Sequence, residues 1–183
     1  MSAYKNILVF VSAVMLSMSA PFLSASSAGD VVGLWRDDGS ILLVQRADDS
    51  LHARLIALRP AETTYTEDEN APWPAGSPRR DDRNPDPSQR DRFLMGLQLL
   101  QNYQFNSGVW QGDIYDPGSG KTYSSTMKIS RAGDLQMRGY VGISMFGRTV
   151  TYTRFDPCAS HGLSVGEQFA EAVSCAIAQT SSD

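Results

Sequence analysis

The residues best placed to do chemistry lie in the stretch 145–155, which alternates bulky or charged side chains with small polar ones. Side chains of a strand point alternately to opposite faces. One face of this stretch therefore carries Phe146, Arg148, Val150, Tyr152 and Arg154. The other face carries mainly threonines, which suit solvent. If the first face points into an apolar interior, each guanidinium needs an anion or a carbonyl oxygen as its partner, because an unpaired buried charge is costly.

Two kinds of partner for Arg148 follow from the sequence. One is an internal carboxylate, either in the long loop described below or at Asp113, which shares a face with Tyr115 on a predicted strand. The other is the acidic head group of an amphipathic ligand, with Tyr152 as a second hydrogen-bond donor. A bidentate bond between a guanidinium and a carboxylate suits such an interior. We therefore predict a ligand-binding site made of Arg148, Tyr152, Asp113 and Tyr115.

The sequence carries no diagnostic catalytic motif. Residues 118–122 resemble the end of a phosphate-binding loop, but Tyr115 stands where that motif needs its first glycine. There is no nucleophile elbow of the form G-x-S-x-G. His52 and His161 have no neighbours at metal-ligand spacing. Paired carboxylates for glycoside hydrolysis need not be close in sequence, so that alternative stays open. We expect a protein that is not an enzyme and that has no cofactor and no metal.

Asp82, Asn84 and Asp86 have the spacing of the first ligands of a calcium-binding loop. Pro87 stands where an EF-hand needs glycine, and Phe93 stands where it needs a bidentate glutamate, so an EF-hand is excluded. A looser calcium site on this loop is an alternative. The preferred interpretation gives Asn84 and Asp86 a structural role, in which their side chains bond the backbone of a turn that the prolines fix.

The charge pattern bears on partners. The chain has 16 basic and 20 acidic residues, a net charge of −4, so no broad basic surface is expected and a nucleic-acid partner is disfavoured. Residues 60–92 hold six prolines and few aliphatic residues, and they form one loop that is too long to be idle in a compact domain. The arginines of this loop alternate with aspartates, which is typical of a salt-bridged surface segment.

The first 28 residues have the pattern of a secretory signal peptide. Lys5 supplies the positive start, residues 7–18 form an apolar or small run, and Ser26 and Ala28 fit a cleavage site. An uncleaved anchor is the alternative, although the run is short for a bilayer span. We expect cleavage after Ala28, a periplasmic or secreted location, and no membrane span in the rest of the chain.

Export would change the interpretation of the cysteines. Cys158 and Cys175 are the two cysteines of the chain, and in an oxidising compartment they predict a structural disulfide. A redox-active pair is the alternative, but such pairs are normally closely spaced. The disulfide would tether the tail 158–183, in which Ser164 and Glu167 form a capping box before an amphipathic helix. This helix has no Lys or Arg, so packing on the domain is favoured over binding to anionic lipid.

Residues 29–157 alternate apolar and polar side chains over eight short stretches separated by turn residues, which is typical of β-strands. The predicted strands are 31–36, 41–46, 51–59, 93–103, 109–115, 122–130, 135–141 and 145–155. A short helix is the alternative for 93–103. Sequential antiparallel strands with tight turns predict an all-β, up-and-down, eight-stranded barrel with a C-terminal α-helix, and a β-sandwich is the alternative. An interior of this size is either filled by side chains or holds one small ligand.

Several motifs within residues 31–155 together resemble one bacterial family. They include Asn84-Pro85-Asp86-Pro87, Trp110-x-Gly112-x-Ile114-Tyr115-Asp116-Pro117, Gly120-Lys121-Thr122-Tyr123, Met137-Arg138-Gly139-Tyr140-Val141-Gly142 and Phe146-Gly147-Arg148. The combination resembles a family of small exported bacterial proteins labelled as a domain of unknown function, DUF2147. The resemblance implies an exported, lipocalin-like β-barrel and supplies no established activity. It does not extend to Cys158 and Cys175.

A second, more general resemblance is to the lipocalins. Gly33-Leu34-Trp35 on the first strand looks like their Gly-x-Trp signature, and Arg154 on the last strand looks like the arginine that covers that tryptophan. The first and last strands of a closed barrel are neighbours, and a guanidinium over an indole ring gains about 0.5–2 kcal/mol. The resemblance implies a structural role for Trp35 and Arg154.

Two functions of different classes follow from this architecture. The first is an exported envelope protein that binds a small amphipathic ligand or an envelope component inside the barrel. The second is a protein-interaction module, such as an inhibitor of secreted enzymes, that uses the long loop. The barrel interior discriminates between them. An interior filled by Trp35, Trp110, Met127, Met137 and Tyr152 would favour the second function, and a cavity of a few hundred Å³ would favour the first.

Overall fold

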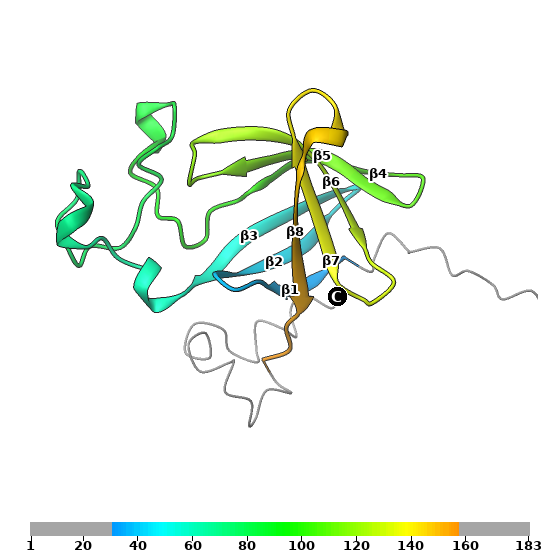
Figure 1. Cartoon of the computed structure of the whole chain (residues 1–183), viewed down its shortest axis with the longest axis horizontal. Helices are drawn as coiled ribbons and strands as arrows, with labels where there is room; N and C mark the ends of the chain where they lie inside the picture. The colour runs from blue at the N-terminus through cyan, green and yellow to red at the C-terminus, as the bar shows by residue number, and fades with distance from the viewer. Residues whose placement is uncertain (1–30, 158–183) are drawn as a thin grey trace, which may run out of the picture.

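The alternating sequence forms eight strands in the computed structural model, which describes residues 31–157 (Figure 1). Each strand pairs antiparallel with the next one along the chain, and β8 returns to pair with β1, so the sheet closes into a barrel. The predicted all-β, up-and-down barrel is therefore confirmed. The strands are β1 (Gly33–Arg36), β2 (Ser40–Ala47), β3 (Ser50–Leu58), β4 (Leu100–Asn106), β5 (Val109–Asp116), β6 (Lys121–Ile129), β7 (Leu135–Tyr140) and β8 (Arg148–Arg154).

Part of the chain lies outside the described residues. The predicted signal peptide, the cysteines Cys158 and Cys175, and the predicted C-terminal helix all fall there, so they stay predictions. Residues 31–157 contain no helix with the length and apolar character needed to cross a membrane.

The direction of the strands gives the barrel two different ends. The end that we term the closed end holds Gly33, Arg154 and the turns 48–49, 107–108 and 130–134. The end that we term the loop end holds the turn 37–39, the long connection 59–99, the turn 117–120 and the segment 141–147. The two longest connections, 59–99 and 141–147, both lie at the loop end, which makes it the more adaptable end.

The closed end is filled by large side chains. Trp35, Tyr103, Trp110 and Met127 are each at most 1% exposed and pack in one cluster. Room for the ring of Tyr103 comes from Gly112 on the neighbouring strand, where an added Cβ would lie 2.5 Å from the ring. The hydroxyl of Tyr103 bonds the hydroxyl of Ser125, which satisfies both buried polar groups.

The connection 59–99 is an irregular segment that lies beside the barrel (Figure 1). It contains three short 3-10 helices, η1 (Pro60–Glu62), η2 (Glu67–Glu69) and η3 (Pro87–Gln89). Its outer part forms a hairpin, because residues 63–65 run antiparallel to residues 76–79. Three backbone hydrogen bonds join these arms, from Tyr65 to Ser77, from Gly76 to Tyr65 and from Arg79 to Thr63.

The predicted bounds of the fourth and the last strand are wrong. The fourth strand runs from Leu100 to Asn106 instead of from 93 to 103, and residues 97–99 only bridge to β3 through Leu97 and Leu99. A register shift between Gln101 and Gln104, with Asn102 at a φ of 55°, explains the mixed hydrophobic period of this stretch. The last strand begins at Arg148 instead of residue 145, because residues 144–146 form a 3-10 helix, η4 (Ser144–Phe146). Phe146 therefore does not share the strand face of Arg148.

The first and last strands meet at the closed end. The guanidinium of Arg154 lies 4.1 Å from the centre of the Trp35 ring and donates to the carbonyl oxygen of Val32 at 3.0 Å. The indole nitrogen of Trp35 donates to the carbonyl oxygen of Val31 at 2.7 Å. Gly33 has a φ of 126°, and a Cβ there would lie 2.7 Å from Nη1 of Arg154, so this position requires glycine. These contacts join the two ends of the sheet.

We predict that Arg154→Gln lowers the free energy of unfolding by about 1–2 kcal/mol, because it removes the cation over Trp35 and the charged bond to Val32. Urea unfolding followed by tryptophan fluorescence measures this change. The neighbouring exposed Thr153→Ala is the control and should stay within about 0.5 kcal/mol of the parent. Equal stability of the Arg154 variant and the parent would show that the contact does not hold the strands together.

Candidate functional site

A cavity of about 660 Å³ opens at the loop end of the barrel. We term it the loop-end cavity. Its inner walls come from Leu99, Met137, Val150 and Tyr152. Its rim is formed by the beginning of the turn 117–120 and by segment 141–147. The cavity therefore lies directly above the packed closed end, and the barrel interior is half filled and half open.

The shape of the cavity follows from which residues face inward. Gly139 and Arg148 are directly paired across β7 and β8, and so are Met137 and Val150. Residues paired in this way share one face of the sheet. Gly139 has no side chain, so it leaves space at the loop end of the barrel. The inward positions at the closed end carry tryptophan and tyrosine instead. The apolar walls suit a hydrocarbon group.

Arg148 stands at the mouth of the cavity. Its side chain is exposed and lines the rim. Within the described part of the chain, Arg148 makes no ion pair with a carboxylate. Asp116, which also lines the cavity, accepts hydrogen bonds from Gly118 and Ser119 of its own turn. The guanidinium of Arg148 is therefore placed to meet an anion that enters from outside.

Tyr152 lies deeper in the same cavity. Its side chain is buried, and burial raises the pKa of its hydroxyl above the ordinary value, with a smaller contribution from the charge of Asp37. The hydroxyl is thus neutral at physiological pH and can donate a hydrogen bond. Arg148 and Tyr152 share one face of β8, as the sequence predicted, and both line the cavity.

The other two predicted site residues take different positions. Strand β5 turns Trp110, Gly112 and Ile114 toward the interior, so Asp113 projects from the opposite face and does not line the cavity. Tyr115, at the end of the strand, lines the rim. The structure thus brings Arg148, Tyr152 and Tyr115 together and leaves Asp113 away from them.

The hydroxyl of Tyr115 belongs to a buried polar network that ties the long connection to the barrel. It donates to Asp81 at 2.5 Å, and Asp81 also accepts from Asn84 at 2.7 Å and from Arg92 at 2.6 Å. The side chain of Asp81 is completely buried. Burial, with the hydrogen bond to Asp81 as the second cause, raises the pKa of Tyr115 to about 12. Asp81 was not predicted, because nothing distinguishes it in sequence from the neighbouring aspartates.

Asn84 and Asp86 lie next to this network and shape a turn. The side chain of Asn84 accepts from the backbone nitrogen of Asp86 at 2.9 Å, and that of Asp86 accepts from the backbone nitrogen of Ser88 at 2.9 Å. The turn brings Arg83 against the β5–β6 connection, where its guanidinium donates to the carbonyl oxygen of Gly118. Among residues 31–157, no three His, Cys, Asp or Glu side chains gather as a metal site would require.

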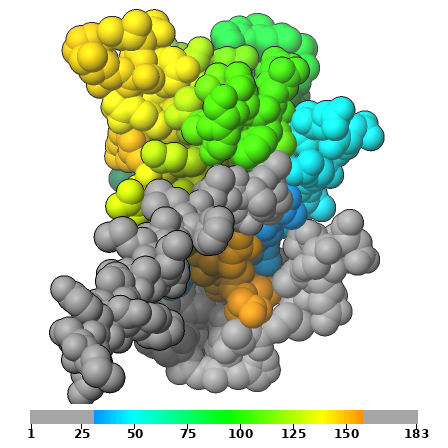
Figure 2. All heavy atoms as spheres, turned by 90° about the vertical axis from the view of Figure 1, so that its right-hand side faces the viewer, coloured from blue at the N-terminus to red at the C-terminus, as the bar shows by residue number. Residues whose placement is uncertain are grey.

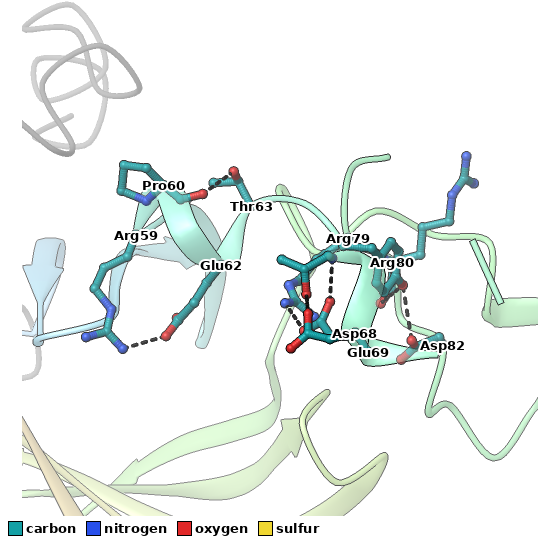
Figure 3. Close-up of polar contacts among 11 residues, drawn as sticks. Arg59, Pro60, Glu62, Thr63, Asp68, Glu69, Arg79, Arg80 and Asp82 are labelled. Atoms are coloured by element: carbon teal, nitrogen blue, oxygen red, sulfur yellow. Dashed lines mark hydrogen bonds and ion pairs between the residues drawn. The ribbon is translucent and has the colours of Figure 1, made fainter. Parts of the chain in front are cut away.

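The remaining arginines of the connection are also engaged (Figure 3). Arg79 pairs with Glu69, and Arg59 pairs with Glu62. The guanidinium of Arg80 lies between the rings of Trp73 and Phe93, 4.3 Å and 4.5 Å from their centres. These cations therefore hold the connection together and are not displayed as a phosphate-binding surface.

Comparison with known proteins gives one family and one solved structure. The model of a family described as "Uncharacterized protein conserved in bacteria (DUF2147)" matches residues 33–154. Protein HP1028 from the human pathogen Helicobacter pylori, which is described as belonging to the lipocalin family, is similar in structure with a TM-score of 0.53. The two chains are 19% identical over 67% of this chain and 80% of that chain, so the likeness concerns the fold. No curated protein matches the sequence.

We predict that Asp81→Ala lowers the free energy of unfolding by about 2–4 kcal/mol, because three buried or partly buried donors lose their acceptor. Urea unfolding measures the loss, and limited trypsin digestion should cut first at the arginines of residues 79–83. Asp91→Ala on the exposed part of the same connection is the control. If both variants resist unfolding and trypsin equally, the network does not anchor the connection.

We also predict that stability falls as the pH rises from about 10 to about 12. The folded-state pKa of Tyr115 is raised to about 12, so the folded protein keeps a proton that the unfolded chain has lost. Each unit of raised pKa corresponds to about 1.4 kcal/mol, and stability is complete below pH 10. Unfolding in urea at several alkaline pH values measures the slope, and Tyr115→Phe should reduce it, whereas the part due to the buried Tyr103 and Tyr152, whose pKa values are also raised, should remain. An unchanged slope in this variant would contradict the assignment.

Proposed function

This chain belongs to the DUF2147 family of bacterial proteins, and we propose that its barrel binds one small amphipathic ligand that carries an acidic head group. The observation that carries the proposal is the loop-end cavity, with apolar walls and, at its mouth, the cation Arg148, which has no carboxylate partner among residues 31–157. Its volume of about 660 Å³ lies within the range typical of small-molecule sites. The lipocalin-like fold suits small-ligand binding in general.

The walls and the mouth of the cavity would bind different parts of the ligand. Met137, Val150 and Leu99 would contact the hydrocarbon part of the ligand, whose removal from water stabilises the complex by about 25 cal/mol per Å². Arg148 would bond the carboxylate or a similar anion with two nitrogens at the mouth. Tyr152 lies deeper in the cavity, where it would contact the inserted part of the ligand. The ligand would therefore be inserted tail first, with its head at the loop end.

We place this activity outside the cytoplasm. The signal-peptide pattern of residues 1–28 supports export, and the pair Cys158 and Cys175 supports an oxidising compartment. In the periplasm or outside the cell, a ligand with a hydrocarbon tail would come from the cell envelope. Cleavage after Ala28 and a Cys158–Cys175 disulfide remain parts of this proposal.

The alternative of a protein-interaction module rests on a filled barrel. Trp35, Trp110 and Met127 do fill the closed end, but Met137 and Tyr152 line an open space. The arginines of the long connection that such a module would present are engaged in contacts within the protein. Both observations favour ligand binding.

We predict that Arg148→Met weakens the binding of a fluorescent long-chain fatty acid about 10- to 100-fold, because a charged hydrogen bond of about 1.5–3 kcal/mol is lost. The free energy of unfolding without ligand should stay equal or rise, since Arg148 makes no ion pair within the described part of the chain that the variant would break. Arg131→Met, in the β6–β7 turn at the closed end, is the matched control.

A long-chain alcohol of the same length separates the head group from the tail. It should bind the parent and the Arg148→Met variant equally, because it has no charge for the arginine to meet. Equal affinity of the parent and the variant for the fatty acid would overturn the role of Arg148. No binding of either compound, together with no lipid in native mass spectra of protein purified from its own envelope, would overturn the proposed function.

A further inference from the structure

Segment 141–146 carries an unusual set of exposed apolar side chains. Val141 is 77% exposed, Ile143 59%, Met145 76% and Phe146 81%. We term these four residues the apolar tip. The other exposed large apolar side chains of residues 31–157 are 38–49% exposed, and they are Phe93, Met95 and Phe105. Single exposed apolar residues are ordinary, but four within six positions indicate a surface that is covered by something else.

The exposure of the apolar tip is built into the fold. The guanidinium of Arg138 on β7 donates to the carbonyl oxygens of Ser144 at 2.8 Å and Met145 at 3.0 Å, and to the hydroxyl of Thr149 at 2.9 Å. At Gly147, an added Cβ would lie 2.5 Å from the carbonyl oxygen of Gly139, so the base of the segment is seated tightly on β7. Arg138 thus braces the backbone while the apolar side chains project, and Figure 2 shows this yellow segment as a protrusion at the top of the molecule.

The charge around the apolar tip differs from that of the whole chain. Two arginines adjoin the apolar tip, Arg138 through its bonds to Ser144 and Met145, and Arg148 two positions after Phe146. Residues 135–153 contain no acidic residue, although the chain carries a net charge of −4, and the carboxylate of Asp116 on the same cavity rim accepts hydrogen bonds from its own turn. A convex, apolar segment next to cations is complementary to an anionic lipid surface, which has negative head groups above an apolar interior. Each cation near an anionic lipid surface contributes about 1 kcal/mol, and apolar side chains insert between the head groups.

We propose that the apolar tip docks the protein on an anionic lipid bilayer by inserting Val141, Ile143, Met145 and Phe146 into the interfacial region. Val141 and Phe146 also line the loop-end cavity, so docking places the cavity mouth at the lipid surface. Ile143 and Met145 do not line the cavity. The docking surface can therefore be altered without changing the ligand site, and the proposal stands whether or not the cavity holds a ligand.

The test is flotation with vesicles of phosphatidylglycerol or of phosphatidylcholine. The variant Ile143→Ser/Met145→Ser should lower the partition onto phosphatidylglycerol vesicles at least tenfold, because two inserted side chains lose their burial. Met95→Ser, on the long connection, is the control and should bind like the parent. All chains carry the same ends, so the contribution of residues outside 31–157 is the same in each. Binding of the parent should be several-fold weaker to phosphatidylcholine and should fall as salt is added.

A second measurement locates the insertion. Ile143→Trp should give an added tryptophan emission that shifts to the blue and is quenched by brominated lipid when phosphatidylglycerol vesicles are present. Equal partition of the double variant and the parent, or an emission that vesicles leave unchanged, would overturn the proposal. It would also be overturned if the parent does not bind vesicles but forms a dimer, or binds a protein, that the double variant loses, since the apolar tip would then be a protein interface.

Discussion

Closure of the sheet between β1 and β8 is the constraint on which the rest of the structure depends. That ladder has two residue pairs, whereas the one between β2 and β3 has eight. Arg154 adds further contacts between β8 and the N-terminal strand, because it stacks on Trp35 and donates a hydrogen bond to the backbone before β1. With the sheet closed, there is no free strand edge in the barrel, and the inward residues of all eight strands surround one interior.

The size of the inward residues then decides what that interior contains. At the closed end, tryptophan and tyrosine side chains pack with Met127 in one buried cluster. At the loop end, Gly139 and Val150 face the same space, and the connection 59–99 leans on the rim through Tyr115 and Asp81 without filling it. The interior of the barrel is therefore packed with side chains at the closed end and contains a cavity at the loop end.

Much of the fold could be predicted from the sequence, because period-two alternation is a local property. The strands β5, β6 and β7 and the shared face of Arg148 and Tyr152 follow from it directly. The errors arise where tertiary contacts decide. In segment 141–147, alternating apolar residues look like strand, but Arg138 draws the carbonyl groups of residues 144 and 145 into a helical turn. Asp81 was missed because its partner Tyr115 lies 34 positions away. Asp113 was placed on the right strand, but sequence alone could not say which face of β5 turns inward.

The paired arms of the long connection have a consequence for how this protein can vary in length. Residues 63–65 and 76–79 hold each other through backbone hydrogen bonds, and the part anchored to the barrel begins only after them, at Asp81. Residues 66–75 therefore form a loop whose two ends are held side by side, and within it Glu69 and Trp73 also contact Arg79 and Arg80. Since the entropy of closing a loop grows slowly with its length, an insertion that keeps Glu69 and Trp73 in place should leave the barrel and its cavity undisturbed. This loop is therefore a suitable place to insert a new segment.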